Sequence, residues 1–496
     1  MLLRLTPVLS PVFSIALSLA APALAAPLHS PVEDQWWQAG RAKLAERLTI
    51  ANRPKQAKNV ILMVGDGMGI ATITAGRIFD GQRPVDGRPA ATGEENSLAF
   101  ERMPHSALIK TYNTNAQVAD SAGTASALNT GVKTRIGVIN FGESQFAEAC
   151  KTPQLLPRTL AETAKARGLA VGVVTTTRVT HATPAAVYGH VPNRNWEGAD
   201  LAYPKPDRAF GCADLAQQLV GFKGGLDLVL GGGRAQFLPS GAGGKRDDGK
   251  DLLAAWQQAG GRYAGDVAAL KALNPTAGAP VLGLFASDHL SFETDRDPAK
   301  QPSLVEMTRF ALARMPKASP KGYYLMIEGG RIDHAHHAGN AFRALSETQQ
   351  FSAAVAEVLK TVNLDETLVL VTADHSHVMT IAGYPRRGND IMGFIQNVKE
   401  GEASGPESPE GWALDKTGRP MTTLTYANGP PLGKNQPRLT PDDKNFQQDK
   451  LYPTDGESHG GEDVALFAAG PRANLVGGVL EQNVVFHIMA EALGWR

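Results

Sequence analysis

The sequence is organised around one stretch, Tyr323-Tyr324-Leu325-Met326-Ile327-Glu328-Gly329-Gly330-Arg331-Ile332-Asp333-His334-Ala335-His336-His337. An apolar run of strand length ends in the carboxylate of Glu328, and an aspartate and three histidines follow two glycines later. Carboxylate and imidazole groups are the ligands that zinc prefers in proteins. The stretch therefore predicts a metal site at the end of a buried strand, provided that other segments supply further ligands. The alternative is a polar loop whose histidines form only local hydrogen bonds.

Two other apolar runs also end in polar residues. Residues 59–64 lead into Gly65-Asp66-Gly67-Met68-Gly69, and residues 367–372 lead into Ala373-Asp374-His375-Ser376-His377. Further apolar runs at 170–176, 226–230 and 463–468 alternate with helical segments such as 340–361 and 484–493. This alternation predicts an α/β fold, with helices on both faces of a largely parallel central sheet in three layers.

The carboxyl ends of parallel strands share one edge of a sheet, where open α/β sheets bind their ligands. We therefore expect four side chains that follow strands to meet at that edge, namely those of Asp66, Glu328, Asp374 and His375. On its own segment, Asp66 has an alternative role as the cap of the helix that follows it.

Residues 118–128 are typical of a helix start that carries Asp120 and Ser121. A serine at this position meets unpaired backbone N–H groups and the positive end of the helix dipole, which favour an alkoxide and anchor an anion. Serine is also a common N-cap residue. This segment alone therefore leaves open whether Ser121 is a nucleophile or a cap.

The composition of the chain limits its possible partners, and the residues at its two ends indicate its cellular compartment. The 496 residues include 49 basic and 49 acidic side chains, which argues against a dedicated nucleic-acid-binding protein. Residues 1–25 are typical of a signal peptide, with Arg4, an apolar core at 12–21 and the cleavage pattern Ala23-Leu24-Ala25. A membrane anchor is the alternative, but this core is short. We expect a periplasmic or secreted protein without a membrane anchor, because the chain ends at Trp495-Arg496 without a hydrophobic tail.

Three further features concern the mature chain, residues 26–496. Residues 32–48 have the pattern of an amphipathic helix. Residues 378–456 are rich in glycine and proline, so we interpret them as an insertion over the sheet edge near the site. The two cysteines, Cys150 and Cys212, can form a disulfide in an oxidising compartment, the alternative being two buried free thiols.

Seven ordered motifs resemble those of the alkaline phosphatases. They are Gly65-Asp66-Gly67-Met68-Gly69, Asp120-Ser121-Ala122, His181-Ala182-Thr183, Asn193-Arg194-Asn195-Trp196, the stretch from Glu328 to His337, Ala373-Asp374-His375-Ser376-His377 and His459-Gly460-Gly461-Glu462-Asp463-Val464. The resemblance runs from about Trp36 to the end and is greater to the animal-type branch. His181 and His334 stand where well-known enterobacterial enzymes carry Asp and Lys. It implies an alkaline-phosphatase-like fold in which residues 378–456 form a crown-like insertion.

The resemblance also implies two zinc ions and one magnesium ion. The first zinc would be held by Asp333, His337 and His459, the second by Asp66, Asp374 and His375, and magnesium by Asp66, Thr183 and Glu328. His181 would lie near magnesium through water, and His334 would lie beside the substrate. His336 and His377 receive no role. Imidazoles suit zinc and an all-oxygen set suits magnesium, so the partition agrees with the ligand chemistry.

By the same resemblance, Ser121 would be the nucleophile that carries phosphate, activated by zinc contact. Arg194 would clamp two phosphate oxygens. The implied activity is hydrolysis of small phosphate monoesters by a homodimer. The animal enzymes carry an additional calcium site, but this chain has Ala286 and Gln301 at two of its ligand positions, so we expect no calcium.

Three other functions compete. A sulfatase would need a modified Cys or Ser followed by proline and arginine, a pattern absent from residues 121–125. Phosphodiesterases of the same superfamily generally lack the third metal set and the arginine clamp. A catalytically inactive metal-binding protein would have no need of Ser121 beside a complete ligand set.

Overall fold

The computed structural model describes residues 55–142, 150–151, 156–398, 405–432 and 439–495. All of them belong to one structural unit, residues 52–496. The expected signal peptide at 1–25 and the expected helix at 32–48 lie outside the described residues.

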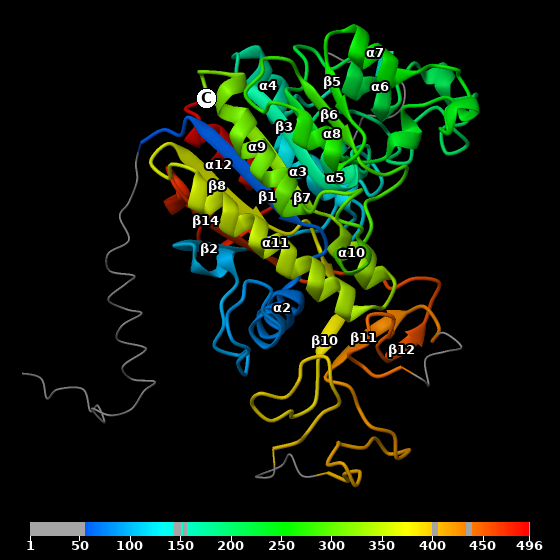
Figure 1. The fold of residues 1–496 in the computed structure, drawn as a ribbon, viewed down its shortest axis with the longest axis vertical. Coiled ribbons are helices and arrows are strands. Elements are labelled where there is room, and N and C mark those ends of the chain that lie inside the picture. The colour runs from blue at the N-terminus through cyan, green and yellow to red at the C-terminus, as the bar shows by residue number, and fades with distance from the viewer. Residues whose placement is uncertain (1–54, 143–149, 152–155, 399–404, 433–438, 496) are drawn as a thin grey trace, which may run out of the picture. The chain divides into compact units, whose positions relative to one another are not determined.

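A ten-stranded sheet forms the centre of this unit (Figure 1). In spatial order its strands are β15 (Val479–Glu481), β2 (His105–Lys110), β14 (Val464–Ala469), β8 (Thr367–Thr372), β1 (Asn59–Gly65), β7 (Tyr323–Gly329), β3 (Ala170–Arg178), β4 (Leu228–Gly232), β6 (Val281–Leu284) and β5 (Arg262–Ala264). Strand β14 runs antiparallel to both β8 and β2, and every other neighbouring pair in this sheet is parallel. The predicted largely parallel sheet is confirmed.

The central strands are the apolar runs of the sequence. Val60 of β1 pairs with Tyr324 of β7 on one side and with Leu368 of β8 on the other. Every residue of β7 and of β8 is buried. Strands covered on both faces need apolar side chains in both directions, which explains the continuous rather than alternating hydrophobic pattern.

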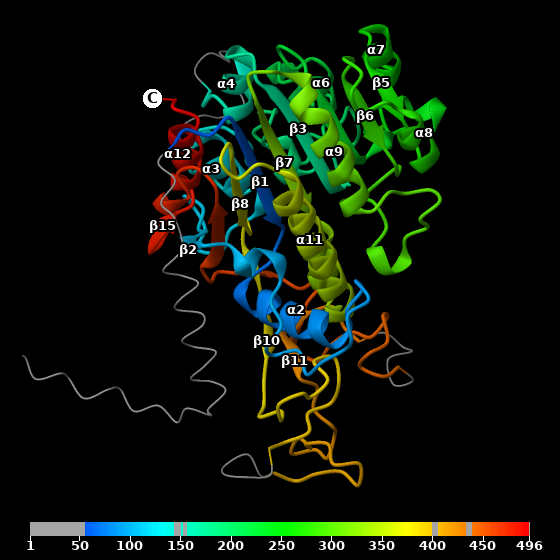
Figure 2. The same cartoon turned by 60° about the vertical axis from the view of Figure 1, so that its left-hand side comes forward.

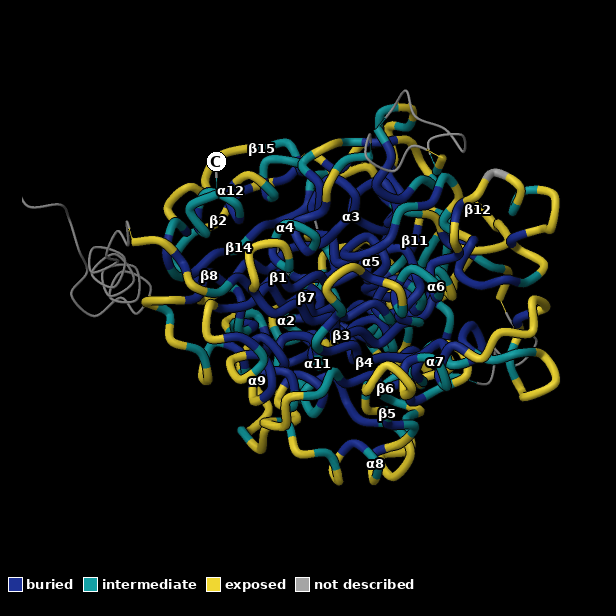
Figure 3. Tube along the Cα trace, turned by 90° about the horizontal axis from the view of Figure 1, so that it is seen from above, coloured by how far each residue is buried: buried dark blue, intermediate teal, exposed yellow. Residues whose placement is uncertain are grey.

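Helices cover both faces of the sheet, so the predicted three-layer arrangement is confirmed (Figures 2 and 3). On one face α9 (Leu304–Ala318) and α11 (Ala341–Thr361) pack against each other and against the central strands. The other face carries α3 (Ser121–Thr130), α4 (Leu160–Ala166), α5 (Ala182–Ala185) and α12 (Val484–Ala492). The remaining described α-helices are α2 (Ile70–Gln82), α6 (Leu215–Val220), α7 (Leu252–Gln258), α8 (Val267–Ala272) and α10 (Arg331–His337).

The two ends of the glycine- and proline-rich segment, residues 378–456, lie side by side. Strand β9 (Ser376–His377) pairs with β13 (His459–Gly460), so that His377 lies opposite His459. Between them, the described residues form a small separate sheet of β10 (Met379–Ile381), β11 (Leu424–Gly429) and β12 (Lys450–Pro453). The segment therefore begins and ends beside the carboxyl edge of β8.

Cys150 and Cys212 form a disulfide, with Cα atoms 5.1 Å apart. The pairing is confirmed, and the alternative of two free thiols is wrong. Within the described ranges, no helix has both the length and the apolar character needed to cross a bilayer.

Candidate metal centre

The carboxyl ends of β1, β7 and β8 bring the expected side chains together. Asp66 follows β1 and belongs to two clusters of potential ligands, one with His181 and Glu328 and one with Asp374 and His375. Within each cluster, one potential ligand atom per residue lies within 4.8 Å of the others. The predicted convergence at the sheet edge is confirmed.

The glycines after β1 let the turn after β8 come close. Gly67 has a φ of +68°, and a Cβ atom there would lie 2.3 Å from the ring of His377. The backbone N–H of Gly67 donates to Asp374 Oδ1 at 3.0 Å, which fixes that carboxylate. Helix α2 begins at Ile70 with Gly69 as its N-cap and without a capping side chain. Asp66 is therefore not a helix cap, and its carboxylate is left for the site.

The first cluster contains Asp333, His337, His377 and His459. The Nε2 atoms of His337 and His459 lie 3.3 and 3.4 Å from Asp333 Oδ1 and 3.1 Å from each other. The Nδ1 atoms of these two histidines face the backbone carbonyls of Glu457 and Ala119. A carbonyl can only accept, so Nδ1 carries the proton and each Nε2 presents a lone pair. Two lone pairs and a carboxylate oxygen then point at one position, which is the donor set of a cation site.

Electrostatics support this arrangement at Asp333. Burial alone would raise the pKa of this carboxyl, but in the absence of a metal a proton taken up by His337 and the hydrogen bonds from the surrounding histidines outweigh burial and hold the pKa well below its ordinary value. The carboxylate of Asp333 therefore stays ionised inside the fold, as a metal ligand must.

The second cluster pairs His375 with two carboxylates. Its Nε2 atom lies 3.4 Å from Asp66 Oδ1 and 3.4 Å from Asp374 Oδ2. Both of these oxygens are buried without a hydrogen-bond partner, as is Oε1 of Glu328. Burial and the neighbouring carboxylates raise the pKa of Asp66 well above its ordinary value, and burial raises that of Glu328 to about 7. Buried carboxylates that repel one another, each with one oxygen that has no partner, fit a site that binds divalent cations.

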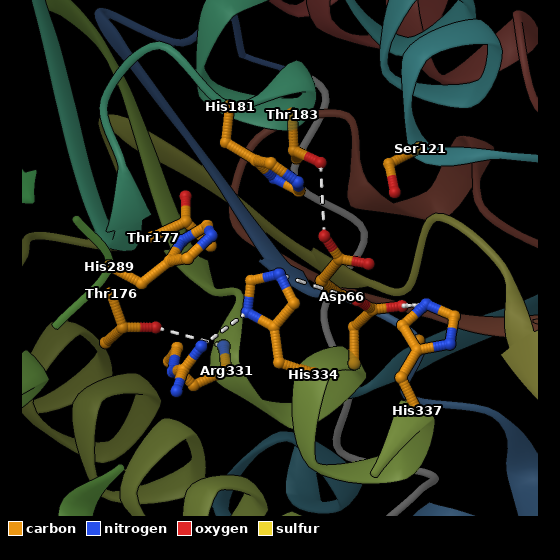
Figure 4. A network of polar contacts seen from close by, with 12 residues as sticks. Asp66, Ser121, Thr176, Thr177, His181, Thr183, His289, Arg331, His334 and His337 are labelled. Atoms are coloured by element: carbon orange, nitrogen blue, oxygen red, sulfur yellow. Dashed lines mark hydrogen bonds and ion pairs between the residues drawn. The ribbon is translucent and has the colours of Figure 1, made fainter. Parts of the chain in front are cut away.

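The third cluster, formed by Asp66, His181 and Glu328, has threonine hydroxyls beside its carboxylates. Thr183 Oγ1 donates to Asp66 Oδ2 at 3.3 Å, and Glu328 Oε2 accepts from the hydroxyls of Thr175 and Thr177. Arg194 Nη2 donates to His181 Nε2 at 3.1 Å, so the proton of this imidazole sits on Nδ1, which has no partner. A protonated ring nitrogen cannot ligate a metal directly but can donate to a metal-bound water. In Figure 4 the hydroxyls of Ser121 and Thr183 both point toward Asp66.

Ser121 is the first residue of α3, and the N-cap role belongs to Asp120, whose Oδ1 accepts from the N–H of Gly123 at 3.1 Å. The interpretation of Ser121 as a cap is therefore wrong. Its Oγ lies 3.1 Å from His375 Nε2. In a serine–histidine pair a carboxylate orients the histidine through Nδ1, whereas here Nδ1 faces the backbone carbonyl of Ser376. The same Nε2 also faces two carboxylates, so the contact indicates a shared metal position rather than a histidine base.

Arg194 contacts Asp120, the neighbour of Ser121 in the chain, and is held by two partners. Its Nη1 donates to Asp120 Oδ2 at 3.0 Å, and its Nη2 donates to His181. The side chain of Arg194 remains 21% exposed. The guanidinium is thus fixed in orientation yet accessible to an anion that approaches Ser121.

One histidine beside the third cluster, His289, was not predicted from the sequence, and His334 was predicted to lie on the substrate side. The ring of His289 lies 4.2 Å from that of His334 and 5.4 Å from that of His181. Arg331 fixes His334 by a contact of 2.9 Å between Nη1 and Nδ1 (Figure 4). His334 thus lies on the side of the third cluster, apart from His337. The signal for His289 was its place shortly after β6, at the same edge of the sheet.

The two unassigned histidines of the motifs have different surroundings. His336 contacts the hydroxyls of Tyr426 at 2.8 Å and Thr72 at 3.0 Å, away from the carboxylates. His377 contacts Asp333 Oδ1 at 2.8 Å and Glu457 Oε2 at 2.5 Å. Burial alone would lower the pKa of His377, but the charge of Glu457 and the hydrogen bonds to both carboxylates raise it to about 10.

Comparisons with known proteins agree with this site. A sequence model of the family described as alkaline phosphatase matches residues 57–495. The chain is 40% identical over 485 residues to the tissue-nonspecific isozyme of alkaline phosphatase from Gallus gallus, which covers 92% of this chain and 89% of that protein. It is 37% identical over 492 residues to an alkaline phosphatase from Gadus morhua, with 94% and 98% covered.

Among solved structures, alkaline phosphatase from Thermus thermophilus superimposes with a TM-score of 0.64 at 26% identity, covering 90% of this chain and 93% of that one. The sequence match extends over nearly the whole described chain and includes every element that contributes to the three clusters. The chain therefore belongs to the alkaline phosphatase family of phosphomonoesterases.

Proposed function

We propose that this protein hydrolyses phosphate monoesters through a phosphoserine on Ser121, at a site that holds two zinc ions and one magnesium ion. The proposed ligands are Asp333, His337 and His459 for the first zinc, Asp66, Asp374 and His375 for the second, and Asp66, Thr183 and Glu328 for magnesium. The observation that carries the proposal is the set of buried, unpartnered oxygens of Asp66, Glu328 and Asp374. Carboxylates at 0% exposure must either take up protons, as the raised pKa values of Asp66 and Glu328 indicate for the metal-free protein, or be balanced by cations, and bound metal ions would supply that charge.

When bound, the metal ions lower the pKa of the serine hydroxyl and of water and stabilise the attacking and leaving oxygens of an in-line displacement. Ser121 Oγ loses its proton to solvent and attacks phosphorus, and the new bond to serine forms as the bond to the ester oxygen breaks. The alcohol leaves with a proton from solvent. Water then attacks the phosphoserine, which releases inorganic phosphate and restores the hydroxyl.

The other residues of the site bind and orient the phosphate. Arg194 offers its fork of N–H groups to the two phosphate oxygens that are not transferred, and its orientation is set in advance by Asp120 and His181. Asp120 is itself fixed by the N–H groups of Gly123 and Gly137. His181 and His334 act through water on the magnesium and substrate side.

The wider organisation is also part of the proposal. We assign residues 1–25 as a signal peptide and residues 26–496 as one catalytic domain, in which 378–456 is an insertion beside the site. The Cys150–Cys212 disulfide supports an oxidising compartment, hence the periplasm or secretion. We also propose that the chain acts as a homodimer.

The test compares three substrates, an aryl phosphate, its methyl diester and an aryl sulfate, with the purified protein before and after chelation. We expect the phosphate monoester to be hydrolysed fastest, chelation to abolish the activity, and zinc with magnesium to restore it. Preferred hydrolysis of the diester or the sulfate would overturn the proposal, as would full activity after the metals are removed.

A further inference from the structure

A buried chain of hydrogen bonds runs from Glu457 through His377 to Asp333. His377 Nδ1 lies 2.5 Å from Glu457 Oε2, and its Nε2 lies 2.8 Å from Asp333 Oδ1. The exposed fractions of the three residues are 2%, 2% and 3%. These hydrogen bonds join Glu457, which directly follows residues 378–456, to α10 through the turn after β8. They therefore connect three separate parts of the sequence at one point.

His377 lies in the first ligand cluster but cannot serve as a fourth ligand. Both of its ring nitrogens face carboxylate oxygens, so both donate and neither presents a lone pair. His337 and His459 differ from it, because each directs Nδ1 at a backbone carbonyl and keeps Nε2 free. The same geometry that qualifies two histidines as ligands therefore makes the third a link between two carboxylates.

Glu457 also holds a second ligand, through its main chain. Its N–H donates to the carbonyl of His337 at 3.0 Å, and its own carbonyl accepts from His337 Nδ1 at 2.5 Å. Its other carboxylate oxygen, Oε1, accepts from the N–H of Val378 at 2.8 Å. Glu457 precedes His459, the third ligand, by two residues, and His459 pairs with His377 across β9 and β13.

We propose that Glu457 is the positioning residue of the first zinc site, which it assembles by fixing Asp333 through His377, His337 through the backbone and the strand that carries His459. The proposal rests on the proposed function for the identity of the metal ligands. Groups that hold metal ligands in place commonly contribute about 10- to 100-fold to metal affinity. Its carboxylate acts on Asp333 through His377 and, through the N–H of Val378, on the strand β9 that pairs with the strand of His459. Removing the carboxylate should therefore weaken this site and leave the second zinc, proposed on Asp66, Asp374 and His375, in place.

The experiment measures zinc affinity in the full-length protein by competition with a chromophoric chelator, together with zinc content after dialysis. The variants are Glu457→Ala and Glu457→Gln, with Asp455→Ala as a control that removes an exposed carboxylate from the same loop. For Glu457→Ala we expect one of two zinc ions to bind about 10- to 100-fold more weakly. Saturating zinc should then restore most of the turnover, because the three ligands remain.

Glu457→Gln should lie between the parent and Glu457→Ala. Its amide oxygen can still accept from Val378, and its shape keeps His377 in place, but the charged acceptor for Nδ1 is lost. If Glu457→Ala does not fold, the zinc affinity of Glu457→Gln alone decides the test. The variant His459→Ala, which removes a proposed ligand, serves as a second control. It should lose the same zinc and, unlike Glu457→Ala, should not recover turnover in saturating zinc.

Unchanged zinc affinity in both Glu457 variants would overturn the inference, and so would an equal loss at both zinc sites. These results differ from a failure of the proposed function, which would appear in the parent protein as the absence of zinc or of monoester hydrolysis.

Discussion

The Nε2 atoms of His337 and His459 lie 3.1 Å apart, although 122 residues separate them in the chain. Each imidazole is fixed by a carbonyl on Nδ1, so the two lone pairs face each other beside Asp333 Oδ1. Facing lone pairs repel unless a cation or a proton lies between them. The fold therefore brings distant segments into an arrangement that only a positive charge stabilises.

Replacement of His459 by alanine should remove one zinc ion selectively. The remaining pair, Asp333 and His337, is too small a set for a stable zinc site, whereas the cluster of Asp66, Asp374 and His375 is untouched. Elemental analysis after dialysis should show one zinc ion fewer per chain than in the parent. The exposed His487 provides the control, since His487→Ala should leave the metal content unchanged. Equal zinc in His459→Ala and the parent would refute the ligand role.

Replacement of Ser121 by alanine should abolish most turnover and leave both zinc ions bound. The hydroxyl is the proposed nucleophile, but the ligands around it do not depend on it. Rapid acid quench followed by mass measurement should find a phosphoryl group on the parent protein and none on Ser121→Ala. Ser240→Ala, at an exposed position, should behave as the parent does. Undiminished activity in Ser121→Ala would remove this residue as the nucleophile.

Much of the fold followed from the sequence because the central strands are buried on both faces. Strand β8 occupies residues 367–372 as predicted, and β1 differs from the prediction only in its final residue, Gly65. The candidate ligands that follow parallel strands were placed by the same argument, because such strands share one edge. The apolar pattern thus predicted both the sheet and the meeting of Asp66, Glu328 and Asp374.

The position of His459 does not follow from that argument. This histidine lies in β13, ahead of the sheet strand β14, and it reaches the same edge only because β14 runs antiparallel to β8, with Leu466 opposite Thr372. Strand direction depends on how the long segment before it returns to the sheet, which no local pattern encodes. The hydrogen bond between Glu457 and His377 could not be predicted from the sequence either. A single glutamate in a polar segment has no distinguishing pattern until the fold places His377 beside it.

Replacement of Arg194 by lysine should weaken phosphate binding more than it lowers stability. Lysine keeps the charge but cannot contact Asp120, His181 and two phosphate oxygens with one planar fork. We expect KM for an aryl phosphate and the inhibition constant of inorganic phosphate to rise together by roughly 10-fold or more, the equivalent of one lost charge-assisted hydrogen bond. The melting temperature should change little, because the side chain is partly exposed. An unaltered inhibition constant for phosphate would contradict the proposed clamp.

Glu347 predicts a pH dependence of stability that is separate from the metal ligands. Its side chain on α11 is 4% exposed and accepts a hydrogen bond from the N–H of Glu293 at 2.6 Å. Burial raises its pKa to about 7, against the opposing effects of that hydrogen bond and of Arg331. A glutamate in the unfolded chain has a pKa of about 4.3, so the folded state binds this proton more tightly.

The sign follows from linkage. Below about pH 4 the carboxyl is protonated in both states, and Glu347 imposes no cost. As the pH rises through the folded pKa of about 7, the unfolded state ionises first and the folded state is progressively destabilised. The full loss is on the order of 3 kcal/mol. Glu347→Gln cannot ionise, so it should escape this loss while still accepting from Glu293. In the metal-free protein, the melting temperature of Glu347→Gln minus that of the parent should therefore increase between pH 5 and pH 8. The exposed Glu410 serves as control, and Glu410→Gln should show no such trend. A difference for Glu347→Gln that stays constant with pH would mean that Glu347 ionises normally in the folded protein.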